Sequence, residues 1–244
     1  MVGALSKQRT TVGAPTLTER TFPRGVKATA VELLGAYVVL TAVWVGIGLL
    51  VTGPLGGSGL TRTDQDIATW FVEQRTESLN DWANIGAGFA DTMVKIIVTA
   101  IIAVIMLAVW RSGREPLMVV LALVLEASVF ITTTWIVNRN RPDVERLESS
   151  PVGSSFPSGH VAAAVAYGAI AVVIFERTRN GLIRTITVVV MVAVPVIVGL
   201  SRMYQGMHYF TDVVAGAALG ATSVAVVYFV FRPAAGQLGG APDR

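Results

Sequence analysis

Six long apolar stretches constrain the fold of this chain more strongly than any other feature of its sequence. They cover approximately residues 31–51, 83–110, 116–137, 159–175, 183–200 and 210–231. A bilayer core of about 30 Å is crossed by roughly 20 apolar residues in a helix. Stretches this apolar must be helical in lipid, because the alternating pattern of a membrane barrel is absent. The sequence therefore predicts an all-α, polytopic membrane protein with six transmembrane helices. Pro195 predicts a kink in the fifth of them.

The composition excludes several classes of protein. Of 244 residues, 53% are apolar and only 14% are charged, whereas a soluble domain carries roughly 25% charged residues. Without Cys and with two His, no disulfide, metal site or other cofactor is expected. The net charge is +3, but the basic residues stand singly at the ends of apolar runs. No nucleic-acid partner is therefore expected, because that requires a clustered basic face.

Six spans place both chain termini on the same side of the membrane. That side would carry twelve basic residues, namely Lys7, Arg9, Arg20, Arg24, Lys27, Arg111, Arg114, Arg177, Arg179, Arg184, Arg232 and Arg244. The other side would carry six, namely Arg62, Arg75, Arg139, Arg141, Arg146 and Arg202. Lys and Arg accumulate on the cytoplasmic side of membrane proteins. We therefore expect a cytoplasmic (plasma) membrane protein with both termini in the cytoplasm.

The segments outside the spans predict the rest of the organisation. Residues 1–27 are polar and basic and are expected to form a disordered cytoplasmic tail. Residues 28–232 would form the transmembrane domain, and residues 233–244 a second flexible tail. In the first outer loop, residues 64–82 predict a short interfacial helix. Its apolar side chains fall roughly on one face: Ile67, Trp70, Phe71 and Leu79.

Three polar clusters, at residues 138–146, 154–160 and 201–212, all fall on the outer side. They bring five chemically capable side chains to one level of the membrane: Arg139, Arg141, His160, Arg202 and His208. Arginines in such loops often only meet lipid headgroups. That alternative does not explain why both histidines of the chain lie in this layer. The clusters therefore predict a functional site at the outer rim of the bundle.

The spacings within these clusters indicate a specific chemistry. His208 and Asp212 are four residues apart, so on a helix the carboxylate would hold the Nδ1–H and leave Nε2 free. Ser158 stands at an N-cap position before Gly159, where open backbone N–H groups can bind an anion. Arginines at 141 and 202 offer forked donors to phosphate oxygens. One histidine would attack phosphorus and the other would protonate the leaving oxygen.

Taken together, these residues resemble the three-part motif of the type 2 phosphatidic acid phosphatase superfamily. The motif is carried by Arg141-Pro142, by Pro157-Ser158-Gly159-His160, and by Ser201-Arg202 with His208 and Asp212. The family includes lipid phosphatases and vanadate-dependent haloperoxidases. The resemblance implies that His208 is the nucleophile, that Asp212 orients it, and that His160 serves as acid and then base. It also implies a metal-free reaction in which Arg141, Arg202, Ser158 and Gly159 hold the phosphate.

One position departs from the family pattern. The first motif usually begins with a Lys, and Thr134 stands there instead. We expect Arg139 to be the nearest substitute among the phosphate-binding residues.

Lys95 and Glu126 lie inside the second and third spans, where isolated charges are costly. We favour an ion pair between them, with Asp91 as a second partner of Lys95; the rival is that Lys95 replaces the missing motif Lys.

The favoured interpretation is an integral membrane lipid phosphatase that acts through a phosphohistidine at the outer face of the membrane. Its candidate substrates, by resemblance, are polyprenyl diphosphate, phosphatidylglycerol phosphate and phosphatidic acid. The alternative is a catalytically weak protein of the same fold that binds lipid phosphate or supports an assembly. A transporter would need more polar residues in its spans, and the haloperoxidases of the family are soluble. Gly216 and Gly220 predict close helix packing within the chain rather than homodimerisation, and the oligomeric state stays open.

Overall fold

The computed structural model describes residues 21–22, 24–149 and 153–232, and it is entirely helical in this part of the chain. Most of the expected N-terminal tail and the whole expected C-terminal tail lie outside the described residues. The helices are α2 (Val26–Thr52), α3 (Gly59–Glu73), α4 (Glu77–Gly88), α5 (Thr92–Trp110), α6 (Arg114–Val137), α7 (Gly159–Ala166), α8 (Gly168–Arg177), α9 (Gly181–Tyr204) and α10 (Phe210–Phe231).

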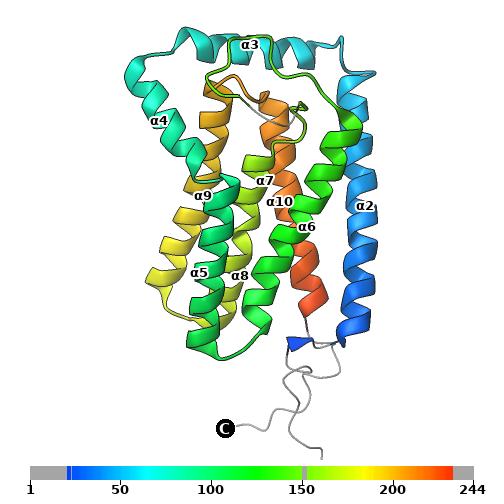
Figure 1. Ribbon diagram of the computed structural model, residues 1–244, viewed down its shortest axis with the longest axis vertical. Helices are drawn as coiled ribbons and strands as arrows, with labels where there is room; N and C mark the ends of the chain where they lie inside the picture. The colour runs from blue at the N-terminus through cyan, green and yellow to red at the C-terminus, as the bar shows by residue number, and fades with distance from the viewer. Residues whose placement is uncertain (1–20, 23, 150–152, 233–244) are drawn as a thin grey trace, which may run out of the picture.

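The predicted fold class is confirmed. Six segments are long and apolar enough to cross a membrane, namely α2, α5, α6, α7 together with α8, α9 and α10. They run alongside one another, and α3 lies across one end of the bundle (Figure 1). The predicted helix in the first outer loop is therefore present. The chain is a multi-pass membrane protein with one helix lying across its spans.

The second span is shorter than predicted, because the chain turns at residues 89–91. The apolar stretch that begins at residue 83 is divided between α4 and α5, and Asp91 is the N-cap of α5. The first outer loop consequently contains two helices where one was expected. Thr76 starts the second of them, since its hydroxyl accepts a hydrogen bond of 3.2 Å from the Leu79 N–H. Lys95 therefore lies at the beginning of α5 and not in the interior of a continuous span.

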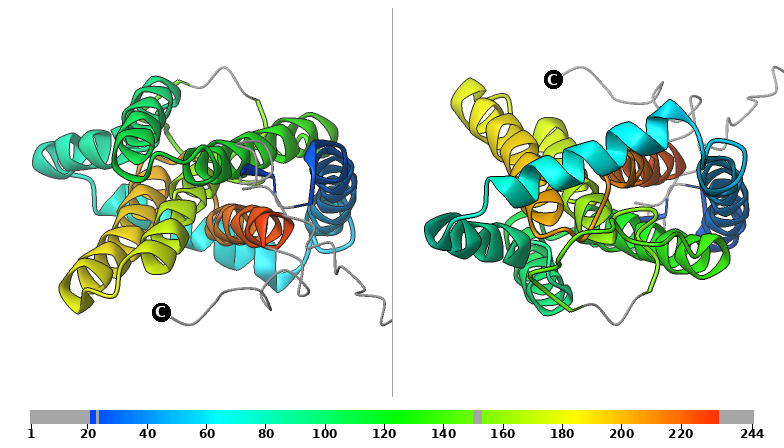
Figure 2. Two further views of the ribbon diagram at one scale, coloured as in Figure 1. Left: turned by 90° about the horizontal axis from the view of Figure 1, so that it is seen from below. Right: turned by 90° about the horizontal axis from the view of Figure 1, so that it is seen from above.

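Other boundaries move less. The first span begins at Val26, five residues before the predicted start at about residue 31. The fourth span is two helices that meet at Tyr167, and the fifth continues through Pro195 to Tyr204. The sixth span has the predicted bounds, Phe210–Phe231. Viewed from either end, α2 and α9 lie on opposite sides of the bundle, with α10 between them (Figure 2).

Two glycines of α10 bring that helix against α7. A Cβ at Gly216 would meet the Ser158 carbonyl, and a Cβ at Gly220 would meet the Ala162 carbonyl. The prediction that this pair packs within the chain is confirmed. The close approach also lets the Ser158 N–H donate a hydrogen bond of 3.0 Å to the Asp212 carbonyl. The start of α7 is thereby fixed against the start of α10.

Candidate active site

A cavity of about 250 Å³ lies between α5, α6, α7, α9 and their connecting loops. Its walls include both histidines and two of the predicted arginines. The residues that matter most for chemistry are Lys95, Arg141, Gly159, His160, Arg202 and His208. Three polar clusters that lie far apart in the sequence therefore converge on one small space.

His208 lies in the turn between α9 and α10 and is 5% exposed. Its Nδ1 is 2.7 Å from the Ser155 carbonyl oxygen. Since a carbonyl only accepts hydrogen bonds, Nδ1 carries the proton and Nε2 keeps its lone pair. Burial, followed by the charges of Arg141 and Arg202, lowers the pKa of His208 well below its ordinary value. The imidazole is therefore neutral at physiological pH, as a nucleophile must be.

The predicted hydrogen bond between Asp212 and His208 is not formed. The Asp212 Oδ2 is 3.9 Å from Nδ1, which is beyond hydrogen-bond distance. The rule for residues four apart does not apply, because His208 precedes the first residue of α10. The Asp212 carboxylate instead accepts bonds of 2.9 Å from the Tyr209 N–H and 2.5 Å from Arg139. Ser155, which the sequence analysis did not select, makes the contact that was predicted for Asp212.

Two arginines give the cavity a positive charge. Arg141 donates to the Met207 carbonyl at 2.5 Å and to the Ser154 carbonyl at 3.3 Å. Burial and the neighbouring Arg202 lower the pKa of Arg141 to about 10, so it is still protonated at neutral pH. Arg202 is 2% exposed, and within the described chain its Nε has no hydrogen-bond partner. Two like charges this close to each other favour the binding of an anion.

Glu148 occupies part of that anion site. Its carboxylate is 2.5 Å from Arg202 Nη1, and the same nitrogen is 3.1 Å from the Gln205 side-chain oxygen. Glu148 lines the cavity from the loop that follows α6, and its side chain is 41% exposed. A carboxylate on this guanidinium stands where a phosphate oxygen would bind. The sequence offers no signal for this contact, because Glu148 lies outside every motif.

The start of α7 provides the second histidine and a free hydroxyl. His160 Nε2 is 3.4 Å from an Asp91 carboxylate oxygen. Gly159 lines the cavity, and a Cβ at this position would lie 2.6 Å from the Phe130 ring. The Ser158 hydroxyl is buried and has no hydrogen-bond partner among the described residues. Ser158, a predicted phosphate ligand, does not itself line the cavity, although the next residue, Gly159, does.

The comparisons with known proteins agree with this arrangement. Residues 115–234, from the first turn of α6 to just beyond α10, match the model of the PAP2 superfamily. This segment is a PAP2 superfamily domain. The matched segment contains all three polar clusters. No curated protein matches the chain.

Two solved structures share the PAP2 fold with this chain. One is the transmembrane PAP2-type phosphatidylglycerolphosphate phosphatase from Bacillus subtilis, with a TM-score of 0.66, 22% identity, and coverage of 82% of this chain and 94% of that one. The other is LpxE from Aquifex aeolicus, with a TM-score of 0.52, 24% identity, and coverage of 67% and 93% respectively. At these identities the likeness shows the fold alone.

Arg139 differs from its predicted place as a phosphate ligand. It does not line the cavity but is enclosed behind His208 by two buried carboxylates. Its Nη2 is 3.0 Å from Asp64, its Nη1 is 2.5 Å from Asp212, and its guanidinium stacks 4.3 Å from the Tyr209 ring centroid. Asp64 was missed by the sequence analysis. The sequence did carry a signal for Asp64: it is an acidic residue on the buried face of the amphipathic segment that forms α3.

The predicted ion pair between Lys95 and Glu126 does not form as a direct contact, although the Lys95 charge acts on the Glu126 carboxyl from a longer distance. No carboxylate in the described part of the chain forms an ion pair with Lys95, and neither Glu126 carboxylate oxygen has a hydrogen-bond partner there. Asp91, the predicted second partner of Lys95, faces His160 instead. The break before α5 explains the difference, because it places Lys95 beside the cavity.

Thr134 stands where the family motif usually has a Lys. Its hydroxyl donates a hydrogen bond of 3.2 Å to the Phe156 carbonyl, away from the cavity.

Proposed function

We propose that this chain is an integral membrane lipid phosphatase that hydrolyses a phosphomonoester or diphosphate of a lipid through a phosphohistidine intermediate. The observation that carries the proposal is the state of His208. Its Nδ1–H is directed at the Ser155 carbonyl, its Nε2 is left with a lone pair, and it shares one cavity with His160 and two arginines.

The first chemical step would transfer the phosphoryl group to the protein. The Nε2 lone pair of His208 attacks phosphorus while Arg141 and Arg202 hold the phosphate oxygens. The bond between phosphorus and the leaving oxygen breaks; this is the lipid oxygen of a monoester or the bridging oxygen of a diphosphate. The electron pair of that bond goes to the leaving oxygen, and His160 supplies the proton. The imidazole gains positive charge as the bond forms. The Asp212 carboxylate, 3.9 Å from Nδ1, stabilises that charge without a hydrogen bond.

The second step would restore the enzyme. His160, now neutral, takes a proton from water, and the oxygen of that water attacks phosphorus. The bond between phosphorus and Nε2 breaks, and its electron pair returns to His208. Inorganic phosphate leaves with the added oxygen. Both steps use only groups of this chain, the substrate and water.

A lipid substrate is supported by the position of the cavity at one end of a bundle of apolar helices. The headgroup would enter the polar layer below α3 while the acyl or prenyl chain stays in the bilayer. Polyprenyl diphosphate, phosphatidylglycerol phosphate and phosphatidic acid remain the candidates, and the Bacillus subtilis relative by its printed name acts on the second of these. The positive-inside distribution of Lys and Arg supports an outward-facing site.

The test is release of phosphate from these three lipids by purified full-length protein in detergent. We expect release from at least one lipid in the presence of excess chelator, and loss of about a thousandfold or more in the His208→Ala variant. Size-exclusion chromatography would show that the variant is folded. Folded wild-type protein that releases phosphate from none of the three lipids would contradict the proposal and favour a lipid-phosphate-binding role.

A further inference from the structure

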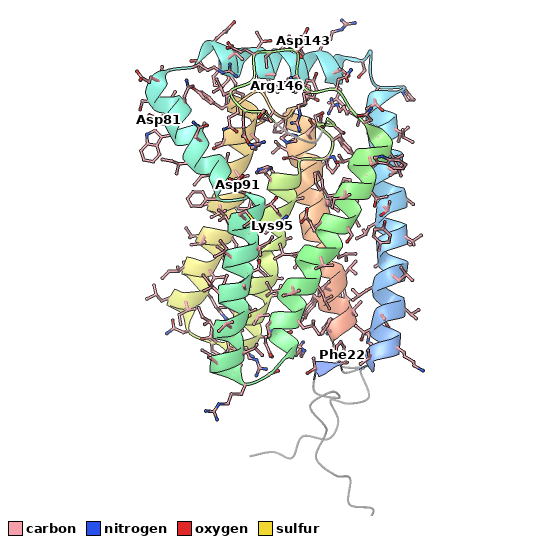
Figure 3. The ribbon with its side chains drawn as sticks, viewed as in Figure 1. Phe22, Asp81, Asp91, Lys95, Asp143 and Arg146 are labelled. Atoms are coloured by element: carbon pink, nitrogen blue, oxygen red, sulfur yellow. The ribbon has the colours of Figure 1, made fainter. Side chains whose placement is uncertain are left out.

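Lys95 is placed at the cavity by a helix that carries none of the residues in the polar clusters. It is the fourth residue of α5, one turn after Asp91, and it lines the same cavity as both histidines. Figure 3 shows the two labelled residues at the upper end of α5, below the loops that carry Asp143 and Arg146. Apart from Thr92 and Thr99, the rest of α5 is apolar. Lys95 is thus the cation that this wall of the cavity presents.

Lys95 makes no direct ion pair within the described chain, although its charge acts on the buried Glu126 carboxyl from a longer distance. None of the carboxylates described there forms an ion pair with it, and Asp91 is engaged with His160. A cation in the first turn of a membrane span is stabilised by a nearby counter-ion. The other cations facing the cavity, Arg141 and Arg202, cannot serve. An anion bound in the cavity would give the Lys95 ammonium a direct partner.

We propose that the Lys95 ammonium binds a phosphate oxygen of the substrate, together with Arg141 and Arg202. Lys95 would thereby supply, from α5, the cation that Thr134 does not supply from α6. An ammonium on a flexible four-carbon stem can follow the headgroup as it enters and as phosphate leaves. The inference rests on the proposed function for its substrate, but the binding of a free anion tests it separately.

A purely structural role of Lys95 predicts different results. If Lys95 only neutralised Glu126 across the helix interface, its loss would change the melting temperature and leave anion affinity unaltered. Glu126→Gln would then have the same effect as loss of Lys95. If Lys95 binds phosphate, the anion affinity changes with Lys95 and not with Glu126.

The experiment measures binding of inorganic phosphate to full-length protein in detergent by calorimetry, alongside KM and kcat for the best lipid. In Lys95→Met we expect the dissociation constant of phosphate and the KM to rise about 10- to 100-fold, the loss expected for one charge-assisted hydrogen bond. Lys95→Arg should stay within about threefold of wild type, and Lys95→Gln should resemble Lys95→Met. Lys27→Met, the same change in the first turn of α2, and Thr134→Val should both leave the phosphate affinity unchanged.

The outcomes separate this inference from the proposed function. Phosphate affinity within about twofold of wild type in Lys95→Met and Lys95→Gln overturns the role of Lys95, even if the wild type hydrolyses lipids. A wild type that binds phosphate through Lys95 but releases none from any lipid overturns the phosphatase and supports the anion site. Wild-type protein that binds no phosphate overturns the anion site, whereas the phosphatase stands or falls with the release of phosphate from the lipids.

Discussion

At the scale of single residues, the proposed chemistry depends on which nitrogen of His208 carries the proton. The Ser155 carbonyl decides this at 2.7 Å, and Asp212 acts from further away through its charge. The histidines and arginines could be predicted, because their types and spacing carry a chemical meaning. The part played by Ser155 could not, since a backbone carbonyl is common to every residue type. The contact between Glu148 and Arg202 could not be predicted either, because it depends on the path of the loop that carries Glu148.

The protonation of His208 can be measured directly, because the chain has only two histidines. The sample is a His160→Gln variant with labelled histidine, in which His208 gives the remaining histidine signal. NMR should show a neutral His208 ring with its proton on Nδ1, and the ring should stay neutral well below the usual histidine pKa of about 6.5. The sign follows from burial and from Arg141 and Arg202, which all disfavour the imidazolium. Arg141→Gln should move the pKa upward. A titration midpoint in the parent at or above about 6.5 would contradict this account.

Glu148 should compete with phosphate for Arg202. Replacing it with Gln removes a negative charge that must move aside when an anion binds. We expect Glu148→Gln to tighten binding of inorganic phosphate about two- to fivefold, a small effect because the side chain is partly exposed. The control is Glu145→Gln in the same loop, where the carboxylate is 83% exposed and 4.0 Å from Arg75. Equal or weaker phosphate binding in Glu148→Gln would show that the carboxylate does not compete.

At the scale of helices, hydropathy predicted the six spans correctly, and the spacing of Gly216 and Gly220 predicted the close packing of α10. The break at residues 89–91 was not predictable from hydropathy, because both sides of it are apolar. The break follows from tertiary packing: α4 contacts α9, where a Cβ at Gly86 would lie 3.0 Å from Ile197. Because of this break, Lys95 lines the cavity, whereas the sequence analysis favoured a structural role for it. Errors in helix boundaries therefore became errors in the site.

The contact between α7 and α10 should be sensitive to one methyl group. Gly216→Ala places a Cβ against the Ser158 carbonyl, which is backbone and cannot move aside cheaply. We expect a loss of about 1–3 kcal/mol in unfolding free energy and a lower kcat, because Ser158 and His160 are displaced. Gly35→Ala in α2 is the control, since nothing lies within 4 Å of its Cβ. Thermal melting and phosphate release in the same detergent would compare the two; equal stability would refute the close packing.

At the scale of the whole molecule, the charges at the two ends of the bundle differ in kind. The end with α3 holds the cavity and the buried Asp64–Arg139–Asp212 cluster. At the opposite end, Arg177 pairs with the buried Glu115, and Arg114 pairs with Glu176 at 2.7 Å. This second cluster ties α6 to α8 far from the cavity. Orientation in the membrane then decides which compartment the proposed reaction serves.

The predicted orientation can be tested because the native chain has no Cys. Asp143→Cys places a thiol in the loop near α3, and Arg179→Cys places one between α8 and α9; both positions are exposed. An impermeant maleimide added to intact cells should label the first variant and not the second. Lysed cells should give labelling of both. The reverse pattern in intact cells would put the site on the cytoplasmic side.

The most direct test of the central claim is to trap the phosphoryl group on the protein. Wild-type protein, mixed with lipid substrate labelled in the terminal phosphate and quenched in alkali within one turnover, should carry acid-labile label on a peptide containing residue 208. His208→Asn should carry no label and His160→Gln should form it slowly. Label on another residue, or unchanged turnover by His208→Asn, would contradict the account.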